Sequence, residues 1–240
     1  NGPFSIVMAD GGLFNTLSAG QPALANPDSL TVGNWQINLS AAKVWEPKLV
    51  RSRQPLQLSS AIAGIIGPYT HWPRLAEGNA FAGSANRLAR AAGQLKQALV
   101  EYDRDESYQE QEKIEKVAWA AGQLAGLGSG LTPAGDDFLM GVMAALWLTG
   151  REGLLPVIAR EAIPQTTMLS GAFLRAAAQG EFMEAWHTLT QALLSGESEA
   201  FRQAVKRVAQ FGASSGLDAL AGFATTLLSL ANEVMIPALH

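Results

Sequence analysis

The chain has 240 residues, of which 48% are hydrophobic and 16% are charged, and its formal net charge is −4. This length and composition allow one large domain or two modest ones with a real core, and they exclude an intrinsically disordered chain. The net charge argues against a general affinity for nucleic acid, and the absence of cysteine excludes disulfides, thiolate metal sites and cysteine nucleophiles.

The first 80 residues favour short strands separated by turns. Residues 4–8 form a short β-like run before a glycine turn, and residues 30–39 alternate apolar and polar side chains at Trp35, Ile37 and Leu39. Prolines recur through the region and forbid long helices. We therefore predict a small, mostly antiparallel β unit over residues 1–80, with a short helix within residues 58–66.

From residue 81 onward the apolar residues recur at helical spacing. Residues 88–99 and 114–124 predict two helices, and the mixed-charge run at 101–116 predicts a solvated loop and an exposed helix face. Further helices are expected at residues 134–149, 153–162, 168–178, 182–194, 199–210 and 217–234. Strands and helices do not alternate, so we predict an α+β fold with a larger helical bundle over residues 81–240.

The compartment is predicted from what the sequence lacks. No basic region followed by an apolar core stands at the N-terminus, and the longest apolar run, residues 138–148, is too short to span a bilayer. We expect a cytoplasmic protein without a membrane partner or a nucleic-acid partner.

The most informative stretch is the glycine-rich turn Gly-Leu-Gly-Ser-Gly-Leu-Thr-Pro-Ala-Gly-Asp-Asp at residues 126–137. Thr132 followed by Pro133 is typical of a helix start, because the hydroxyl can cap free N–H groups and proline at the first helical position loses no hydrogen bond. The N–H groups at the positive end of the helix suit an anion. Gly135, inside the first turn, costs about 1 kcal/mol relative to alanine and indicates close contact with a helix or a ligand.

Two carboxylates, Asp136 and Asp137, follow directly, and at least one is expected to face the interior. Carboxylates repel phosphate, so a Mg²⁺ ion could bridge them to a ligand, they could accept hydrogen bonds from an –NH2 group, or one could act as a general base. The sequence holds no obvious metal-ligand cluster, so we favour the amide contact and predict no cofactor. A purely structural turn, with aspartates placed by the helix dipole, is the alternative.

A second turn echoes the first. The segment Ser129-Gly-Leu131 is repeated as residues 215–217, and Asp137 and Gly141 have the same four-residue spacing as Asp218 and Gly222. Two such helix starts could converge on one ligand, whereas a capped helix–helix connection is the structural alternative. Residues 212–216 also match the G-x-S-x-G nucleophile elbow, but that motif needs a preceding strand and residues 199–210 predict a helix.

A third candidate turn begins at Ser170 and Gly171, before a helix that carries Arg175. It could add a further contact or the positive charge that the two glycine turns lack. An ordinary helix cap is the alternative.

At these residues the sequence resembles a known family. Gly128-x-Gly-Leu-Thr-Pro-x-Gly-Asp-Asp137 is similar to the signature of the AllH (YlbF-like) family, long catalogued as a domain of unknown function. Residues 214–218 resemble the second motif of that family, and weaker similarities cover residues 34–47 and 167–180.

The resemblance implies a role in purine (allantoin) catabolism as a subunit of oxamate carbamoyltransferase, with FdrA-like and YlbE-like partner subunits. That enzyme interconverts oxalurate plus phosphate with oxamate plus carbamoyl phosphate, so the expected ligand is a small anion such as oxalurate, oxamate or carbamoyl phosphate. A noncatalytic scaffold or regulatory subunit, and a small-molecule hydrolase using one of the two aspartates, stay open as alternatives.

From the turns and the resemblance together, we predict the residues of the site. The predicted catalytic residues are Asp136 and Asp137. The predicted substrate-binding residues are Gly128, Ser129, Gly130, Leu131, Thr132, Gly135, Ser170, Ser214, Ser215, Gly216 and Asp218.

Overall fold

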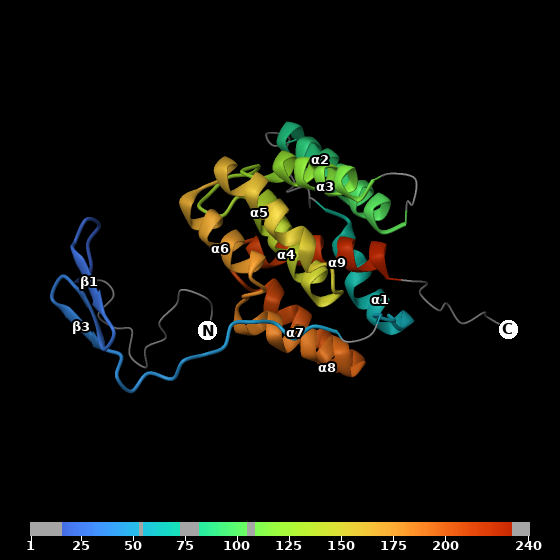
Figure 1. The fold of residues 1–240 in the computed structure, drawn as a ribbon. Helices are drawn as coiled ribbons and strands as arrows, with labels where there is room; N and C mark the ends of the chain where they lie inside the picture. Colours follow the sequence, from blue (N-terminus) through green and yellow to red (C-terminus); the bar gives the residue numbers. More distant parts are fainter. Residues whose placement is uncertain (1–15, 53–54, 73–81, 105–108, 232–240) are drawn as a thin grey trace. The chain divides into compact units, whose positions relative to one another are not determined.

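The computed structural model describes residues 16–52, 55–72, 82–104 and 109–231 (Figure 1). Its contacts divide the chain into two units, Asn1–Glu46 and Pro47–His240. Within the described residues, a small antiparallel sheet precedes a larger helical part, which confirms the predicted α+β fold class. The strand expected at residues 4–8 lies outside the described residues.

The first unit contains a three-stranded antiparallel sheet in the order β1-β2-β3. Its strands are β1 (Ala23–Asn26), β2 (Ser29–Val32) and β3 (Trp35–Asn38). The predicted strand at residues 30–39 is therefore two strands joined by a two-residue turn, in which Gly33 has a φ of 56°. The alternation of half-buried and exposed residues along β3 is the predicted one.

The second unit is mainly helical in its described residues, which also include an isolated antiparallel bridge between Lys48 and Glu181. Its α-helices are α1 (Ser60–Ile66), α2 (Ala82–Arg104), α3 (Glu110–Leu124), α4 (Ala134–Leu148), α5 (Leu155–Ala162), α6 (Met168–Ala178), α7 (Glu184–Ser195), α8 (Ser198–Ala209) and α9 (Ser215–Leu230). Short 3-10 helices add η2 (Gly67–Thr70), η4 (Glu152–Leu154) and η5 (Ile163–Gln165). Most of these bounds lie within two residues of the predicted ones, since the apolar spacing and the turn residues mark them.

The predicted boundary near residue 80 stays a prediction; in the structure, the contacts group Pro47 and the residues after it with the helical part. The reason lies in α1 and η2, which pack on helices from the end of the chain: α1 contacts α8, and η2 contacts α9. Buried Ile62 and Ile66 of α1 belong to the same hydrophobic core as the later helices.

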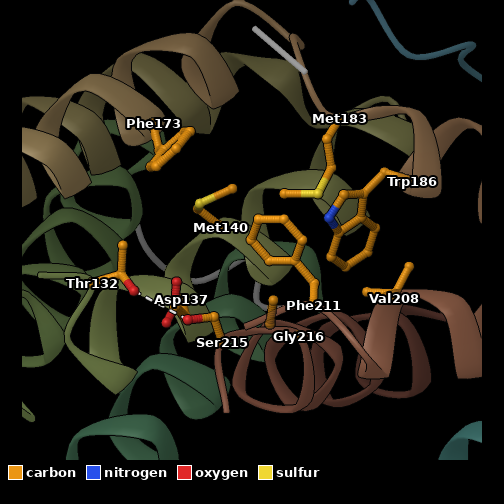
Figure 2. Close-up of a pocket in the computed structure, with 11 residues that line it drawn as sticks. Thr132, Asp137, Met140, Phe173, Met183, Trp186, Val208, Phe211, Ser215 and Gly216 are labelled. Atoms are coloured by element: carbon orange, nitrogen blue, oxygen red, sulfur yellow. Dashed lines mark hydrogen bonds between the residues drawn. The ribbon is translucent and has the colours of Figure 1, made fainter. Parts of the chain in front are cut away.

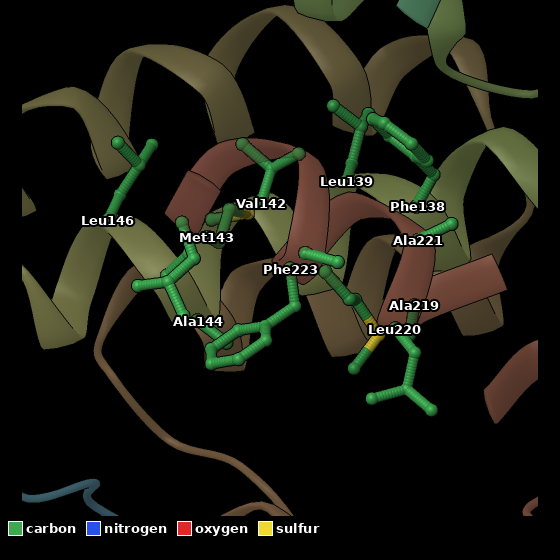
Figure 3. Packing of buried hydrophobic residues seen from close by; sticks show 14 of the residues in the cluster. Phe138, Leu139, Val142, Met143, Ala144, Leu146, Ala219, Leu220, Ala221 and Phe223 are labelled. Atoms are coloured by element: carbon green, nitrogen blue, oxygen red, sulfur yellow. The ribbon is translucent and has the colours of Figure 1, made fainter. Parts of the chain in front are cut away.

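The core of the second unit is built on α4 and α9, which pack against each other along their length (Figure 3). Every residue of α4 from Gly135 to Leu148 is buried, as expected of a helix that is apolar on all sides. The α2–α3 pair and the α7–α8 pair lie on opposite sides of this central pair (Figure 1). None of the described helices combines the length and the apolar character needed to cross a membrane.

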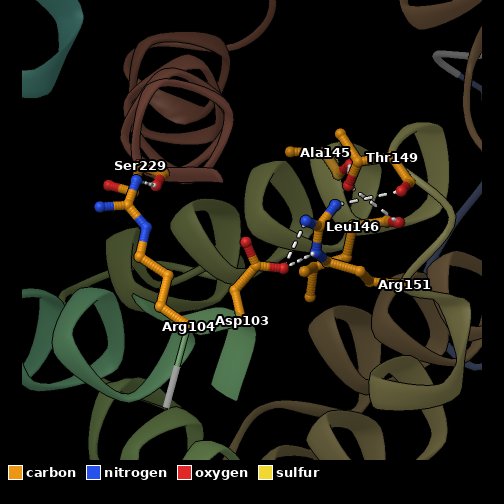
Figure 4. A network of polar contacts seen from close by, with 7 residues as sticks. All are labelled: Asp103, Arg104, Ala145, Leu146, Thr149, Arg151 and Ser229. Atoms are coloured by element: carbon orange, nitrogen blue, oxygen red, sulfur yellow. Dashed lines mark hydrogen bonds and ion pairs between the residues drawn. The ribbon is translucent and has the colours of Figure 1, made fainter. Parts of the chain in front are cut away.

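A polar network joins the ends of α2, α4 and α9 (Figure 4). The guanidinium of Arg151, just after α4, donates from Nε to Asp103 at 2.8 Å and from a terminal nitrogen to the same carboxylate. Arg104 donates to the backbone carbonyl of Ser229 at 3.3 Å. These contacts tie the last turn of α2 to both central helices at the end of the bundle that lies away from the glycine-rich turn.

Candidate functional site

Asp136 lies inside the glycine-rich turn and holds it in place. Its side chain is buried; one carboxylate oxygen accepts a hydrogen bond from the backbone N–H of Gly126 at 2.9 Å, and the other accepts one from the hydroxyl of Thr166. The carboxylate thereby joins the end of α3 to the segment that precedes α6. Since the chain's own donors occupy both oxygens, this geometry favours a positioning role, and the catalytic role of Asp136 stays a prediction.

Removal of the Asp136 carboxylate is expected to destabilise the turn. In Asp136→Ala, the Gly126 N–H and the Thr166 hydroxyl lose their acceptor in a partly buried place, which should lower the free energy of unfolding by about 2 kcal/mol. Asp136→Asn keeps an oxygen for Gly126 and an amide donor for Thr166, so it should lose much less. Urea unfolding of both variants checks this, and equal losses would contradict the assigned role.

The glycines of this turn are required mainly by the chain itself. A Cβ on Gly135 would lie 2.0 Å from the carbonyl oxygen of Leu124, so the close contact predicted for Gly135 is made with the end of α3. Gly128 has a φ of 124°, which side chains rarely adopt, and it lies against the backbone of Ala134. Residues 128–131 form the exposed outer part of the turn.

Three backbone N–H groups at each of the two helix starts already have partners. In α4, Gly135 donates to Leu127, and Asp136 and Asp137 donate to Pro133. In α9, Gly216 donates to Phe211, and the next two residues donate to the carbonyl of Ser214. A ligand at either helix start would therefore compete with these hydrogen bonds, which favours side chains over the backbone as the binding groups.

The start of α4 differs from the sequence prediction by one residue. Pro133 is the residue before the helix, and no side chain caps it. The Thr132 hydroxyl lies instead 3.0 Å from the hydroxyl of Ser215, at the start of α9. The expected cap is therefore wrong, because tertiary packing brings Thr132 a hydroxyl partner from a segment 83 residues away.

Ser170 lies inside α6 rather than at its start. Thr167 caps this helix by accepting a hydrogen bond from the Ser170 N–H at 3.1 Å. The hydroxyls of both residues point to the backbone carbonyl of Leu131, at 2.6 Å from Thr167 and 3.5 Å from Ser170. The start of α6 therefore supports the glycine-rich turn, whereas Arg175 is exposed near the far end of the helix.

A small pocket opens beside the carboxylate of Asp137 (Figure 2). Thr132 and Ser215 place their hydroxyls next to this carboxylate, so the polar groups gather on one side of the pocket. The other walls are almost entirely apolar and come from α4, α6 and the segments around α7, α8 and α9. They are Met140, Phe173, Met183, Trp186, Val208, Phe211, Gly216 and Ala219.

The carboxylate of Asp137 is both buried and incompletely paired. It is 5% exposed, and its Oδ2 atom has no hydrogen-bond partner. Burial raises the pKa of Asp137 to about 7; hydrogen bonds from Ser215 and Thr132 oppose this rise, whereas the nearby carboxylates of Asp218 and Asp136 add to it. Near neutral pH, Asp137 can therefore accept or release a proton.

Asp218 occupies the corresponding place at the start of α9, but its carboxylate is paired. The indole Nε1 of Trp72 donates to it at 2.6 Å, and the Trp72 ring lies against Phe138 with ring centroids 4.5 Å apart. Burial raises the pKa of Asp218, and hydrogen bonds from Trp72 and Ser214 counteract the rise.

Residues 124–227 match the family model of the oxamate carbamoyltransferase subunit AllH. The matched segment runs from the end of α3 to α9 and contains both glycine turns and the Asp137 pocket. The resemblance read from the glycine-rich turn is thus confirmed, whereas the weaker similarity at residues 34–47 lies outside the match. No solved structure gives a significant match to the chain.

Within this AllH segment, the structure brings together four of the predicted site residues, Thr132, Asp137, Ser215 and Gly216. The remaining predicted site residues either support the two glycine turns or lie on the outer side of the first turn. The apolar walls were not predicted, because their side chains come from several helices and follow ordinary helical spacing. Trp72 was also missed, since a lone tryptophan 146 residues before its partner leaves no local signal.

A metal ion would need ligands that the described part of the chain does not assemble. Across those residues, no group of three or more His, Asp and Glu side chains is placed to hold one. The pocket itself offers one carboxylate, two hydroxyls and apolar walls.

Proposed function

We propose that this chain is a subunit of an oxamate carbamoyltransferase and that the Asp137 pocket binds the amide group of the substrate. The observation that carries the proposal is the buried, unpaired Oδ2 of Asp137 at a pocket within the AllH segment. An unsatisfied buried acceptor costs free energy, so its presence favours a ligand that supplies the missing N–H donor.

In the proposed reaction, Asp137 positions the amide nitrogen of oxamate and takes up its proton. The nitrogen forms a bond to the carbamoyl carbon of carbamoyl phosphate, the carbon–oxygen bond to phosphate breaks, and phosphate leaves with the bonding electrons. The proton passes to Asp137 and then to phosphate or solvent, so that oxalurate and phosphate are the products. A carboxylate with a pKa of about 7 suits this exchange at neutral pH.

The phosphate would need positive charge that the pocket does not offer, because none of its lining residues is Lys or Arg. We propose that FdrA-like and YlbE-like subunits supply it. Leu131 and Met168 are 73% and 93% exposed, and the hydrogen bond from Thr167 to the Leu131 carbonyl places them near each other. Such exposed apolar residues beside the glycine-rich turn favour this face as the docking surface for a partner. We place this complex in the cytoplasm and in purine catabolism.

The same exposed residues favour the second candidate function, a noncatalytic subunit that shapes a site on its partners. The two candidates differ in what they require of Asp137. A scaffold needs the exposed face and the fold, whereas a substrate-binding subunit also needs the carboxylate.

Asp137→Asn separates these two functions in the assembled complex. The variant should co-purify with the partner subunits but lose carbamoyl transfer by about 100-fold or more, the usual effect of removing a general base. Glu199→Gln, which makes the same change on an exposed residue of α8, should retain normal activity. Full activity of an assembled Asp137→Asn complex would leave the scaffold as the better description.

A further inference from the structure

The two central helices are related by an approximate internal twofold symmetry. A Cβ on Gly141 of α4 would lie 1.7 Å from the carbonyl oxygen of Ala219, and a Cβ on Gly222 of α9 would lie 1.9 Å from that of Phe138. In each helix, the contacted carbonyl belongs to the residue three positions before that helix's own glycine. The contact is therefore reciprocal, and it pairs Gly141 with Gly222 and Phe138 with Ala219.

The starts of the two helices obey the same relation. A Cβ on Gly135 would lie 2.0 Å from the carbonyl oxygen of Leu124 in α3, and one on Gly216 would lie 1.9 Å from that of Val208 in α8. Asp137 and Asp218 each stand two residues after these glycines, so they are equivalent positions. The repeat of residues 129–131 at residues 215–217, noted in the sequence, therefore does not join equivalent positions of the two halves.

The symmetry extends over the rest of the helical unit. In chain order, α1, η2, α2, α3 and α4 correspond to α5, α6, α7, α8 and α9. The contacts between helices follow the same correspondence. The contact of α1 with α8 corresponds to that of α5 with α3, and the contact of η2 with α9 corresponds to that of α6 with α4. The α2–α3 pair likewise corresponds to the α7–α8 pair. The helical unit thus consists of two intertwined halves of similar packing, with a buried aspartate at the equivalent position of each half, Asp137 and Asp218.

The two aspartates differ in what reaches them. At Asp218, the Trp72 indole donates its N–H to the carboxylate and lays its ring against Phe138. At Asp137, the equivalent of Phe138 is the much smaller Ala219, which lines the open pocket, and Oδ2 has no donor. The chain therefore fills one copy of the site with its own planar N–H donor and leaves space in the other.

We propose that the Asp137 pocket takes a planar, uncharged group that donates an N–H to the carboxylate and lays its face toward Ala219, as Trp72 does at Asp218. The inference rests on the proposed function, which puts the amide of the substrate in this pocket, and it adds how the group lies there and which groups the pocket rejects. Apolar walls and neighbouring carboxylates exclude a phosphate group from the same place. The anionic part of any substrate must then lie outside this pocket.

The test uses two small probes of nearly equal shape, pyrrole and furan, which differ in the N–H group. Binding to the isolated full chain at pH 8, where Asp137 is ionised, is followed by NMR of chains labelled at the methionine methyl groups. Met140 and Met183 line the pocket and should respond, whereas exposed Met168 should not. Pyrrole should bind at least about tenfold more tightly than furan, because a hydrogen bond to a charged group is lost with furan.

Asp137→Leu should abolish the preference for pyrrole, and inorganic phosphate should leave the Met140 and Met183 signals unchanged. Equal binding of pyrrole and furan to the wild-type chain, or a phosphate response at these methionines, overturns the proposal. In Trp72→Ala the second copy is vacated, so calorimetry should find two bound pyrroles instead of one; one pyrrole in a folded variant also overturns it. These binding measurements need neither partner subunits nor turnover. They can therefore contradict the inference while the activity of the Asp137→Asn complex supports the proposed function, and they can support the inference while that activity contradicts the function.

Discussion

Gly141→Ala is expected to destabilise the helical unit more than any other single methyl addition in α4. The added Cβ would meet the carbonyl oxygen of Ala219 at 1.7 Å and the backbone nitrogen of Phe223 at 2.7 Å. Both are backbone atoms, so α4 and α9 must move apart along a contact that forms the core. Such overpacking should lower the free energy of unfolding by about 3 kcal/mol or more, against a gain in helix propensity of about 1 kcal/mol.

Gly93→Ala provides a matched control, because Gly93 is also inside a helix, α2, but a Cβ there has no atom within 4 Å. It should stabilise the chain by up to about 1 kcal/mol through helix propensity alone. In thermal unfolding, a loss of 3 kcal/mol corresponds to a midpoint lower by about 6–12 °C for a unit of this size. A gain of stability in both variants would contradict the close backbone contact between α4 and α9.

Asp137→Asn is expected to make the chain more stable at pH 8, although the proposed function predicts that the same change abolishes carbamoyl transfer by the complex. Some acids have a higher pKa in the folded chain than in the unfolded chain. At pH values between these two pKa values, the folded chain binds more protons than the unfolded chain does. The free energy of unfolding therefore falls as pH rises from about 4, the ordinary value for aspartate, to about 7, the value for Asp137. The loss is complete above pH 7 and amounts to at most about 4 kcal/mol.

Asparagine keeps the shape of the side chain but carries no charge, so the variant avoids this penalty. It should be more stable than the wild type at pH 8 by about 2–4 kcal/mol and nearly equal to it at pH 4. Part of the pH dependence will persist, because burial also raises the pKa of Asp218. Urea unfolding at pH 4.5, 6 and 8 checks the result, with Glu199→Gln as the exposed control. Parallel pH profiles for wild type and Asp137→Asn would show that Asp137 has an ordinary pKa.

The raised pKa also connects stability with function. A carboxylate that destabilises the folded chain above neutral pH is expected at a site where a ligand supplies the missing hydrogen bond. Asp136 shows the contrast, since its neighbours satisfy both oxygens and its replacement should destabilise the turn. The two adjacent aspartates thus differ in the hydrogen-bond donors that reach each one.

The sequence by itself determined the helices, the antiparallel character of the sheet and the burial of α4. These features follow from local spacing: apolar residues at helical intervals, alternation along residues 35–39, and a run without charge at residues 138–148. The echo between Asp137–Gly141 and Asp218–Gly222 was also visible, because the two halves carry the same residues at their closest backbone contacts. The family resemblance rested on the same glycines and aspartates.

Only the tertiary structure decided which of these residues lie together at one pocket. The different surroundings of Asp136 and Asp137 depend on Gly126, Thr166 and Ser215, which reach them from other segments. The pairing of Asp218 with Trp72 spans 146 residues and separates a filled copy of the site from an open one. Local patterns specify which elements form, but the hydrogen-bond partners of a buried carboxylate depend on how those elements pack, and this packing is what leaves Asp137 open to a ligand.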